Sequence, residues 1–514
     1  MNMNLQSANP QDPIQTIPEL PQLGLTTASL REIIPAPAAA KPTRIAFLGC
    51  GVKIHFPWAQ TCGSYDRAFV AADTALDKAS FELIRAPEPF ENPDALVRWL
   101  DENATDLAGI ILFHAAYTAG EIGSYLGRWL TDHPLPLLSW SLPDPHSERL
   151  TANSLCCQNF ILNMLTRFGV RYAWAHQKTQ EGPPPILWTF CRSVRARQRL
   201  RYGKLLHVGG TRVTAFYDGE TDELAVMRRF GLRFDRVDLE AVFQHARTFS
   251  DAMVKRLADS LVGSPRCARR EVPDAQIFQT LRLGLAIMDL SVKHNYIGCT
   301  IKSWPELFDQ YGCAADGAVS MLNDAGLCTA EEGDMHGLIS SLAMYLLSDG
   351  RAVPTMMDIS GIDSIANRIA LWHCGASPTR LLKPGTTFEA RRHSILENAD
   401  ATTAVGLMVE FLLKTGPATV VRYQSPAAER CFAFEGDMMD CQMPFRGVYG
   451  EMQPTAPWTA TDLISTIIGK GLDHHWSLGF GHWKPSLQLL NHWLGVTELT
   501  SEHSAELSGL SRSA

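Results

Sequence analysis

The stretch RIAFL at residues 44–48 is the first of several short apolar runs that alternate with longer amphipathic stretches. The next runs along the chain are residues 81–85, 109–113 and 135–140. Short strands separated by amphipathic helices are typical of βα units, whose strands stack into a parallel sheet. Residues 43–180 are therefore predicted to form a first α/β domain, which ends before the EGPPP spacer at 181–185.

The same alternation resumes after the spacer and predicts a second α/β domain over residues 181–375. Its strands are expected at residues 204–208, 232–237, 296–302, 327–330 and 353–358. Helical periodicity is clearest over residues 274–293 and 337–347, which lie between these strands.

The last part of the chain, residues 376–514, follows a different pattern. TVVRYQ at 419–424 and CFAFEGDMMD at 431–440 alternate with a period of two and are separated by turn residues, as antiparallel strands are. The predicted fold class is therefore α/β, with two successive Rossmann-like parallel-sheet domains followed by a mostly antiparallel β-rich C-terminal domain. Residues 1–42 are rich in Pro, Gln, Thr and Ala without periodicity, and are predicted to be a flexible arm or an oligomer strap.

Composition narrows the function. The chain of 514 residues has 46 basic and 54 acidic side chains, and its net charge of -8 offers no attraction for a nucleic-acid backbone. No apolar run is long enough for a membrane helix, and the N-terminus lacks the features of a secretory signal. We therefore expect a cytoplasmic protein with neither a nucleic-acid nor a membrane partner. The 12 cysteines show no CxxC pair and no zinc-like spacing, so we expect buried thiols rather than metal ligands or disulfides.

Two glycine motifs raise the possibility of a dinucleotide site. Gly49-Cys50-Gly51 follows the first predicted strand, and Gly209-Gly210 follows the strand at 204–208, but neither motif has the third glycine of the dinucleotide fingerprint. Glycine after a parallel strand more often serves a tight turn. An NAD-dependent oxidoreductase is kept only as an alternative class.

Carboxylates and imidazoles gather at three places near predicted strand ends. These are Glu331-Glu332-Gly333-Asp334, Asp358, and Asp473-His474-His475. Such a set suits a hard divalent cation such as Mn²⁺ or Mg²⁺, but the segments are far apart and their spacing does not show that they converge. Ordinary roles stay open. Asp334 or Glu331 could cap the helix near Gly337, Asp358 could end a strand, and the histidines could pack beside Trp476.

Six segments in the same order carry a family resemblance. They are LTANSL at 150–155, FYDGE at 216–220 with DEL at 222–224, IKSWPE at 301–306, AEEGDMHG at 330–337, PTMMD at 354–358 and LWHCG at 371–375. With these segments, the chain from about 44 to 500 resembles the L-fucose isomerase and L-arabinose isomerase superfamily, and its L-fucose isomerase-like branch in particular.

The resemblance implies an aldose-ketose isomerase that works through a cis-enediol. It also implies a Mn²⁺ site, with Mg²⁺ or Co²⁺ as possible substitutes, between the second α/β domain and the C-terminal domain. Carried over by position, the metal ligands are Glu332, Asp358 and His475, with Glu331 and His474 as the alternatives one residue away. Glu332 and Asp358 are also expected to be the catalytic proton carriers, because removing a proton next to a carbonyl needs an acid, a base and stabilisation of the enediolate.

The matched segments also offer groups that could bind the sugar. These candidates are Lys302, Trp304, Trp372, His373, His474 and Trp476. A tryptophan on an apolar strand often belongs to the core instead, and Lys302 could simply point to water.

Departures from the family pattern leave the substrate open. Ser303 stands where a cysteine is common, and Gly375-Ala376-Ser377-Pro378 replaces the usual G-N-A-P. The small-molecule substrate is therefore an ordinary aldose or a modified one, such as a sulfonated, sulfoquinovose-like sugar. The cations available for an acidic substrate are Lys53, Arg391, Arg392 and His393. A catalytically silent sugar-binding paralogue is a further alternative. The resemblance also implies a homo-oligomer with sites near the subunit interfaces.

Overall fold

The computed structural model of the chain describes residues 24–37, 40–504 and 506–508, and it divides into two compact units. Residues 39–198 belong to the first unit, and residues 17–38 and 199–514 to the second. Most of the predicted N-terminal arm lies outside the described residues. Its described part contains a helix that the sequence did not predict, α1 (Thr27–Ile33), whose Leu30 is fully buried and whose Arg31 donates to the backbone oxygen of Ala325 at 2.6 Å.

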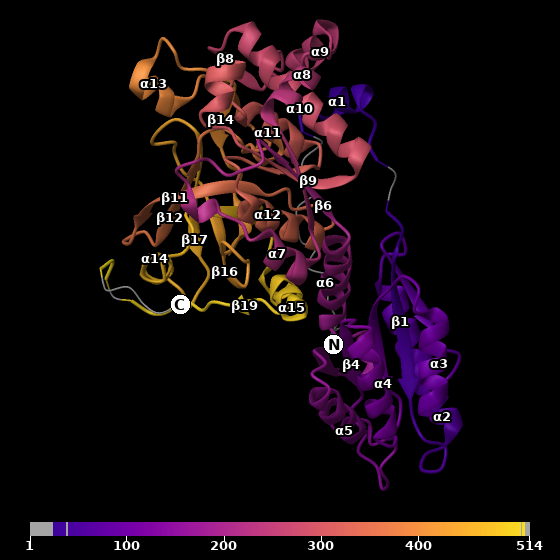
Figure 1. Cartoon of the computed structure of the whole chain (residues 1–514). Helices are drawn as coiled ribbons and strands as arrows, with labels where there is room; N and C mark the ends of the chain where they lie inside the picture. The colour runs from indigo at the N-terminus through magenta and orange to yellow at the C-terminus, as the bar shows by residue number, and fades with distance from the viewer. Residues whose placement is uncertain (1–23, 38–39, 505, 509–514) are drawn as a thin grey trace, which may run out of the picture. The chain divides into compact units, whose positions relative to one another are not determined.

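The first unit is a parallel sheet covered by helices on both faces (Figure 1). Its strands are β1 (Thr43–Cys50), β2 (Phe81–Arg85), β3 (Leu107–His114), β4 (Leu137–Ser141) and β5 (Tyr172–His176), in the order β2-β1-β3-β4-β5. One core contains side chains of α3 (Pro93–Asn103), α4 (Glu121–Asp132) and α5 (Ser154–Arg167). On the other face, Tyr65 of α2 (Trp58–Ala75) donates to the Phe47 oxygen, and α6 (Ile186–Arg201) packs closely over Gly109.

The second unit begins with another parallel sheet. Its strands are β6 (Lys204–Val208), β7 (Arg233–Val237), β9 (Tyr296–Ile301) and β10 (Cys328–Ala330), in the order β10-β9-β6-β7. The helices of this region are α7 (Glu223–Phe230), α8 (Leu239–Ala246), α9 (Asp251–Leu261), α10 (Asp274–His294), α11 (Asp316–Asp324) and α12 (Met335–Leu347). The strands predicted at 204–208, 232–237, 296–302 and 327–330 are thereby confirmed.

The rest of the second unit is a large, mostly antiparallel sheet. Its strands are β8 (Cys267–Arg270), β11 (Thr355–Asp363), β12 (Arg368–His373), β13 (Phe388–Arg391), β14 (Met408–Leu412), β15 (Gly416–Tyr423), β16 (Arg430–Met439), β17 (Val448–Pro454), β18 (His475–Phe480) and β19 (Thr497–Glu498). The order within the described chain is β19-β16-β15-β18-β11-β12-β17-β14-β13-β8, and β16 also pairs with β17. This extra pairing closes the strands from β16 through β18 to β17 into a ring. The helices α13 (Ser394–Asp400), α14 (Ala460–Gly469) and α15 (Lys484–Leu494) accompany it.

One predicted strand belongs to a different sheet from the one expected. Residues 353–358 were assigned to the second parallel sheet, but β11 pairs antiparallel with β12 and β18. An apolar run predicts a buried strand without indicating its neighbours, so this difference was not readable from periodicity. The predicted fold class itself is confirmed, with two parallel-sheet regions followed by a mostly antiparallel one.

Helix α12 joins the two sheets of the second unit. It follows β10 directly, and almost all of its side chains are buried. Ser341 on this helix hydrogen bonds Ser477 of β18 at 2.9 Å, and the Ser340 hydroxyl accepts from the Tyr423 backbone of β15. The helix therefore fixes the end of β10 relative to the antiparallel ring.

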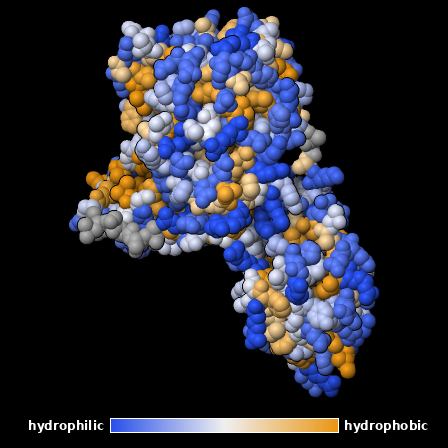
Figure 2. Space-filling model, in the orientation of Figure 1, coloured by the Kyte–Doolittle hydropathy of each residue, from blue (hydrophilic) through white to orange (hydrophobic). Residues whose placement is uncertain are grey.

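The hydropathy of the helices and of the surface agrees with the lack of long apolar runs in the sequence. None of the helices in the described ranges is long and apolar enough to cross a membrane. The face drawn in Figure 2 is mostly hydrophilic, with apolar side chains in separate groups.

Candidate metal centre

A tight turn after β10 positions the first carboxylate. Glu332 and Gly333 both have left-handed backbone angles, with φ of 61° and 69°. A non-glycine residue takes this conformation at a cost of roughly 1–2 kcal/mol. The turn is held because Glu332 accepts from the Val213 N–H at 3.1 Å, while Gly333 donates to Ile301 at 2.8 Å. A side chain at Gly333 would begin 2.6 Å from the Arg212 Cα, so this position requires glycine.

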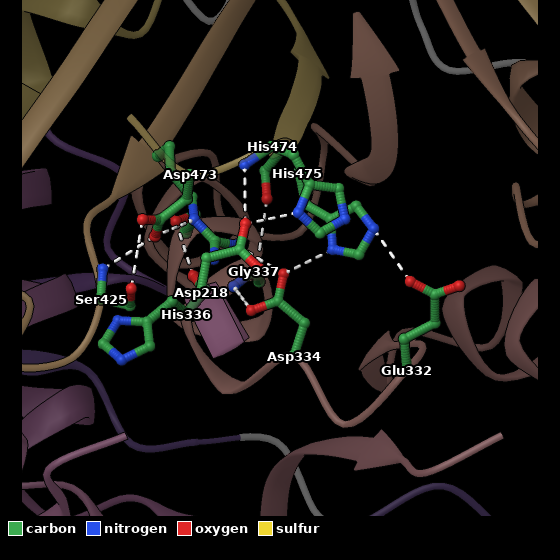
Figure 3. Close-up of polar contacts among 12 residues, drawn as sticks. Asp218, Glu332, Asp334, His336, Gly337, Ser425, Asp473, His474 and His475 are labelled. Atoms are coloured by element: carbon green, nitrogen blue, oxygen red, sulfur yellow. Dashed lines mark hydrogen bonds and ion pairs between the residues drawn. The ribbon is translucent and has the colours of Figure 1, made fainter. Parts of the chain in front are cut away.

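Glu332, Asp358 and His475 meet at the edge of the antiparallel ring. Asp358 and His475 are directly opposite each other on β11 and β18, with Asp358 Oδ1 3.7 Å from His475 Nε2. The same nitrogen lies 3.0 Å from Glu332 Oε2 (Figure 3). The three residues expected to be metal ligands are therefore brought together from segments far apart in the sequence.

Asp334 supports this cluster from behind. Its carboxylate accepts from the Gly337 N–H at 2.9 Å, which confirms the capping role that was left open for it. The same carboxylate lies 3.0 Å from His475 Nδ1 (Figure 3). It also lies 2.5 Å from Arg422 Nη1. A carboxylate on one imidazole nitrogen fixes the ring, so that Nε2 faces Glu332 and Asp358.

Arg422 continues the network to Asp473. Its Nε donates to Asp473 Oδ2 at 2.9 Å, and that oxygen also accepts from the Ser425 N–H at 2.8 Å. Arg422 is 1% exposed, so its charge is compensated by two carboxylates rather than by water. No role for Arg422 was predicted from the sequence, although a cation within the apolar strand TVVRYQ is a usable sign of a buried acidic partner.

The electrostatics of His475 are unusual for a buried histidine. Burial alone would lower its pKa, but the hydrogen bonds to Asp334 and Glu332 outweigh burial and raise the pKa to about 10. Burial likewise opposes ionisation of Glu332, while the hydrogen bond and charge of His475 lower the pKa of that carboxyl. Without a metal ion, a proton on His475 therefore supplies the positive charge that these carboxylates require.

The pKa of the neighbouring Glu331 carboxyl is shifted in the opposite direction from that of Glu332. Its burial and the nearby Asp316, Glu332 and Asp358 carboxylates raise its pKa well above the usual range. Burial also raises the pKa of Asp316 to about 7. Glu332, unlike Glu331, belongs to a set of ligand atoms that lie close together with His373 and His475, which favours Glu332 as the metal ligand.

Several buried polar atoms fit a cation. Asp358 Oδ1 and His373 Nδ1 have no hydrogen-bond partner among the described residues. Glu332, His373 and His475 each offer one ligand atom, and these atoms lie within 4.8 Å of one another. Buried polar atoms without partners are costly, and a mixed carboxylate and imidazole set suits first-row divalent ions. His373, expected at the substrate, thus also lies within reach of a metal ion.

His474 lies at the outer side of the cluster. Its Nδ1 is 2.5 Å from Asp218 Oδ2, and this hydrogen bond lowers the pKa of Asp218 to about 2. Its ring centroid is 3.8 Å from that of His475, but its side chain is 45% exposed against 4% for His475. Its own partner and its exposure favour His475 over His474 as the ligand.

The structure places some of the predicted substrate-binding residues at the cluster and others away from it. His373 lies at the cluster, and Trp372 is paired with Asp358 in register and donates to the Arg446 oxygen at 2.8 Å. Trp476 does not reach the site. It follows His475 on a strand and points to the opposite face, where it is 1% exposed and packs against Phe432 and Phe434.

Lys302 and Trp304 lie beyond the end of β9. Lys302 forms an ion pair with Glu306 and does not simply point to water. The Trp304 ring meets that of His393 at 5.1 Å, and the pKa of His393 is lowered to about 4 by burial and by His373. His393 is therefore electrostatically linked to the cluster.

The other cations considered for an acidic substrate are engaged elsewhere or are not placed at the cluster. Arg391 pairs with Glu271 and Glu389, and Arg392 donates to the Ala401 oxygen. Lys53 belongs to the first unit.

Fold and site together define the class of the protein. It is an α/β protein with an antiparallel ring, and it has a buried cluster of carboxylates and imidazoles suited to a divalent cation. No family model matches the chain. It is similar to proteins named sulfoquinovose isomerase, at 24% identity over 395 residues for the protein of Alkalicoccus urumqiensis, covering 76% of this chain and 85% of the relative.

Two other relatives bear the same name. The protein of Priestia aryabhattai is 23% identical, with 79% of this chain and 88% of the relative covered. The protein of Clostridium sp. (strain MSTE9) is 25% identical, with 69% and 78% covered. These names confirm the prediction of an enzyme of the isomerase class. They agree with the sulfonated-sugar alternative more closely than with an unmodified aldose.

Proposed function

We propose that this protein is a metal-dependent aldose-ketose isomerase, of the L-fucose isomerase-like type, whose substrate is a sulfonated aldose of the sulfoquinovose kind. The observation that carries the proposal is the convergence of Glu332 and Asp358 on Nε2 of the buried His475, at 3.0 and 3.7 Å. The names of the relatives support the isomerase reaction and the sulfonated substrate. Mn²⁺ is the proposed ion, held by these three residues, with His373 in reach of it.

The chain's own groups account for the proton transfer. An aldose becomes its ketose when the C2 proton is removed and a proton is returned to C1, while the O2 hydroxyl loses its proton and O1 gains one. The carboxylates of Glu332, in the turn after β10, and of Asp358, on β11, both approach His475 Nε2, so one can accept the carbon proton while the other serves the oxygens. A divalent cation held here would supply positive charge to the developing enediolate.

The remaining groups have positioning roles in this proposal. Asp334 holds the His475 ring through Nδ1, and Arg422 holds Asp334. Trp304, His393 and Lys302 form the proposed sugar-binding side, because Trp304 contacts His393 and His393 interacts with His373. Trp372 flanks Asp358 from β12. A homo-oligomer whose neighbouring subunits complete the sites remains part of the proposal.

Proton NMR in D₂O tests the reaction directly. Purified protein is incubated with sulfoquinovose, glucose, L-fucose and L-arabinose, first with Mn²⁺ and then with EDTA. The proposal expects loss of the C2 proton signal and appearance of the ketose for sulfoquinovose, with the activity removed by EDTA and restored by Mn²⁺. If the C2 proton is lost only from an unmodified aldose, the protein is an isomerase but its substrate is not a sulfonated sugar.

The same samples also test the alternative of a catalytically silent sugar-binding paralogue. If the protein binds Mn²⁺ and sulfoquinovose but exchanges no C2 proton on any sugar, the isomerase proposal is wrong and a binding role replaces it. Exchange that is unchanged by EDTA, with metal removal verified by elemental analysis, would reject the metal-dependent mechanism.

A further inference from the structure

Cys50, His114 and Cys157 form a second cluster, in the first unit. Cys50 is the last residue of β1 and His114 the last of β3, and the two are paired in register. Cys157 reaches them from α5. In the order β2-β1-β3-β4-β5, the chain leaves β1 and β3 towards opposite edges of the sheet. The cluster therefore lies at the point where open α/β sheets commonly bind ligands.

The distances match the corners of a tetrahedral metal site. Each cysteine Sγ lies 3.5 Å from His114 Nδ1, and the three atoms are all within 4.8 Å of one another. Zinc binds sulfur at about 2.3 Å and imidazole nitrogen at about 2.0–2.1 Å, so two such bonds at a tetrahedral angle place sulfur and nitrogen about 3.5 Å apart. All three residues are fully buried.

The opposite side of the imidazole is already fixed. His114 Nε2 lies 2.7 Å from the Ser139 hydroxyl, which also accepts from Gln158 Nε2 at 3.0 Å. Metal-binding histidines usually have the second nitrogen held by a polar group, which orients the first nitrogen towards the ion. Here that arrangement points Nδ1 at both sulfurs. Thr118, whose backbone interacts with Cys157, has a buried hydroxyl with no partner among the described residues, and it is available to a fourth ligand from solvent.

The charges of a loaded site would balance. Zinc with two thiolates and a neutral imidazole is a set of zero net charge, so the buried site would need no further counter-ion.

We propose that Cys50, His114 and Cys157 form a zinc site that ties β1, β3 and α5 together, with solvent in the fourth position. This proposal is independent of the isomerase reaction, because all three ligands belong to the first unit. It revises the expectation from cysteine spacing that these thiols bind no metal. That expectation considered only neighbours in sequence, whereas the three ligands come from separate elements of the sheet and its covering helix.

Cobalt substitution tests the proposed site. The full-length protein, purified with a phosphine reductant and without chelator, is titrated with Co²⁺ and followed by absorption. Thiolate ligation produces a sulfur-to-cobalt charge-transfer band in the near ultraviolet, whereas the carboxylate and imidazole cluster around Glu332 has no thiolate and produces none. The expected result is a band that saturates at about one Co²⁺ per chain and is abolished by Zn²⁺.

Matched serine variants locate the ligands. Cys50→Ser and Cys157→Ser should each lose the band, and Cys191→Ser, a buried free thiol of the same unit, should keep it. Absence of the band in reduced wild-type protein would overturn the proposal even if the variants fail to fold. So would a Cys50–Cys157 disulfide found by mass spectrometry in protein that binds no Co²⁺ after reduction, or a band that both cluster variants retain.

Discussion

Asp358 and His475 are direct cross-strand partners on β11 and β18, and their side chains approach to 3.7 Å between Oδ1 and Nε2. Because register sets which residues lie opposite each other in antiparallel strands, this pairing positions a carboxylate beside an imidazole without relying on a flexible loop. His474, the next residue along the chain, belongs to the exposed side and pairs with Asp218.

The two adjacent histidines should therefore differ sharply on substitution. We expect His475→Ala to abolish Mn²⁺ binding and reduce turnover by at least about 100-fold, since losing a ligand or its support typically has that effect. His474→Ala should retain metal binding. Calorimetric titration of both variants with Mn²⁺, beside steady-state kinetics, provides the comparison. The reverse pattern would assign the ligand to His474.

Glu332→Gln tests the proposed proton carrier. The amide keeps the shape of the side chain but cannot accept a proton, so we expect kcat to fall by about 10²–10⁴-fold. Glu451→Gln is a matched control, because Glu451 lies on β17 and pairs with Arg368. Full turnover by Glu332→Gln protein with Mn²⁺ bound would contradict the assigned role.

Asp334→Asn should act through the orientation of His475. We expect a 10- to 100-fold loss in metal affinity, because the amide holds the imidazole less firmly than a carboxylate. Removing this charge also leaves Arg422 with one partner, which destabilises the fold. Asp473→Asn disturbs Arg422 in the same way without touching His475. Comparing Mn²⁺ affinities of the two variants at equal thermal stability separates orientation from folding, and equal affinities would remove the orienting role.

The sequence predicted which residues form the candidate site, but it did not predict the residues that hold them in place. Family order placed Glu332, Asp358 and His475, and the structure brings these three together. Asp334 was placed in the acidic segment near the metal ligands and considered as a helix cap, but its contacts with His475 and Arg422 were not predicted because both are distant in sequence. Pairing between remote strands is set by the packing of whole sheets, which local periodicity does not contain.

Two further errors have the same physical origin. Residues 353–358 were recognised as a strand, but their neighbours β12 and β18 place them in the antiparallel ring. Helix α1 was missed because seven residues are too few for a clear periodic pattern, and its stability depends on burying Leu30 against the second unit. In both cases tertiary packing decided what the local sequence left open.

Substitution of Trp476 and of Trp304 should have different effects, because we expect the first to pack in the core and the second to bind the substrate. Trp476→Ala removes a fully buried ring, and we expect the free energy of unfolding to fall by about 3–5 kcal/mol. Trp304→Ala should instead raise KM for the sulfonated sugar, with a smaller loss of stability, because Trp304 is only partly buried. Denaturant unfolding and initial-rate kinetics measure both quantities. If Trp304→Ala leaves KM unchanged, this side of the cluster does not bind the sugar.

Metal affinity should rise with pH. The metal-free pKa of His475 is raised to about 10, so between about pH 6.5 and 8.5 the ring carries a proton that a bound ion must displace. Apparent Mn²⁺ affinity should therefore increase by up to about tenfold per pH unit, which is about 1.4 kcal/mol.

The stability of the metal-free protein should change in the opposite sense and fall as the pH rises. A histidine whose folded pKa is raised stabilises the fold fully below its unfolded pKa, near 6.5, and this contribution is lost as the pH rises through about 10. Calorimetry in buffers of different ionisation enthalpy counts the released proton, and His475→Gln is the control that should remove it. A pH-independent affinity with no proton release would show that His475 is already neutral in the metal-free protein.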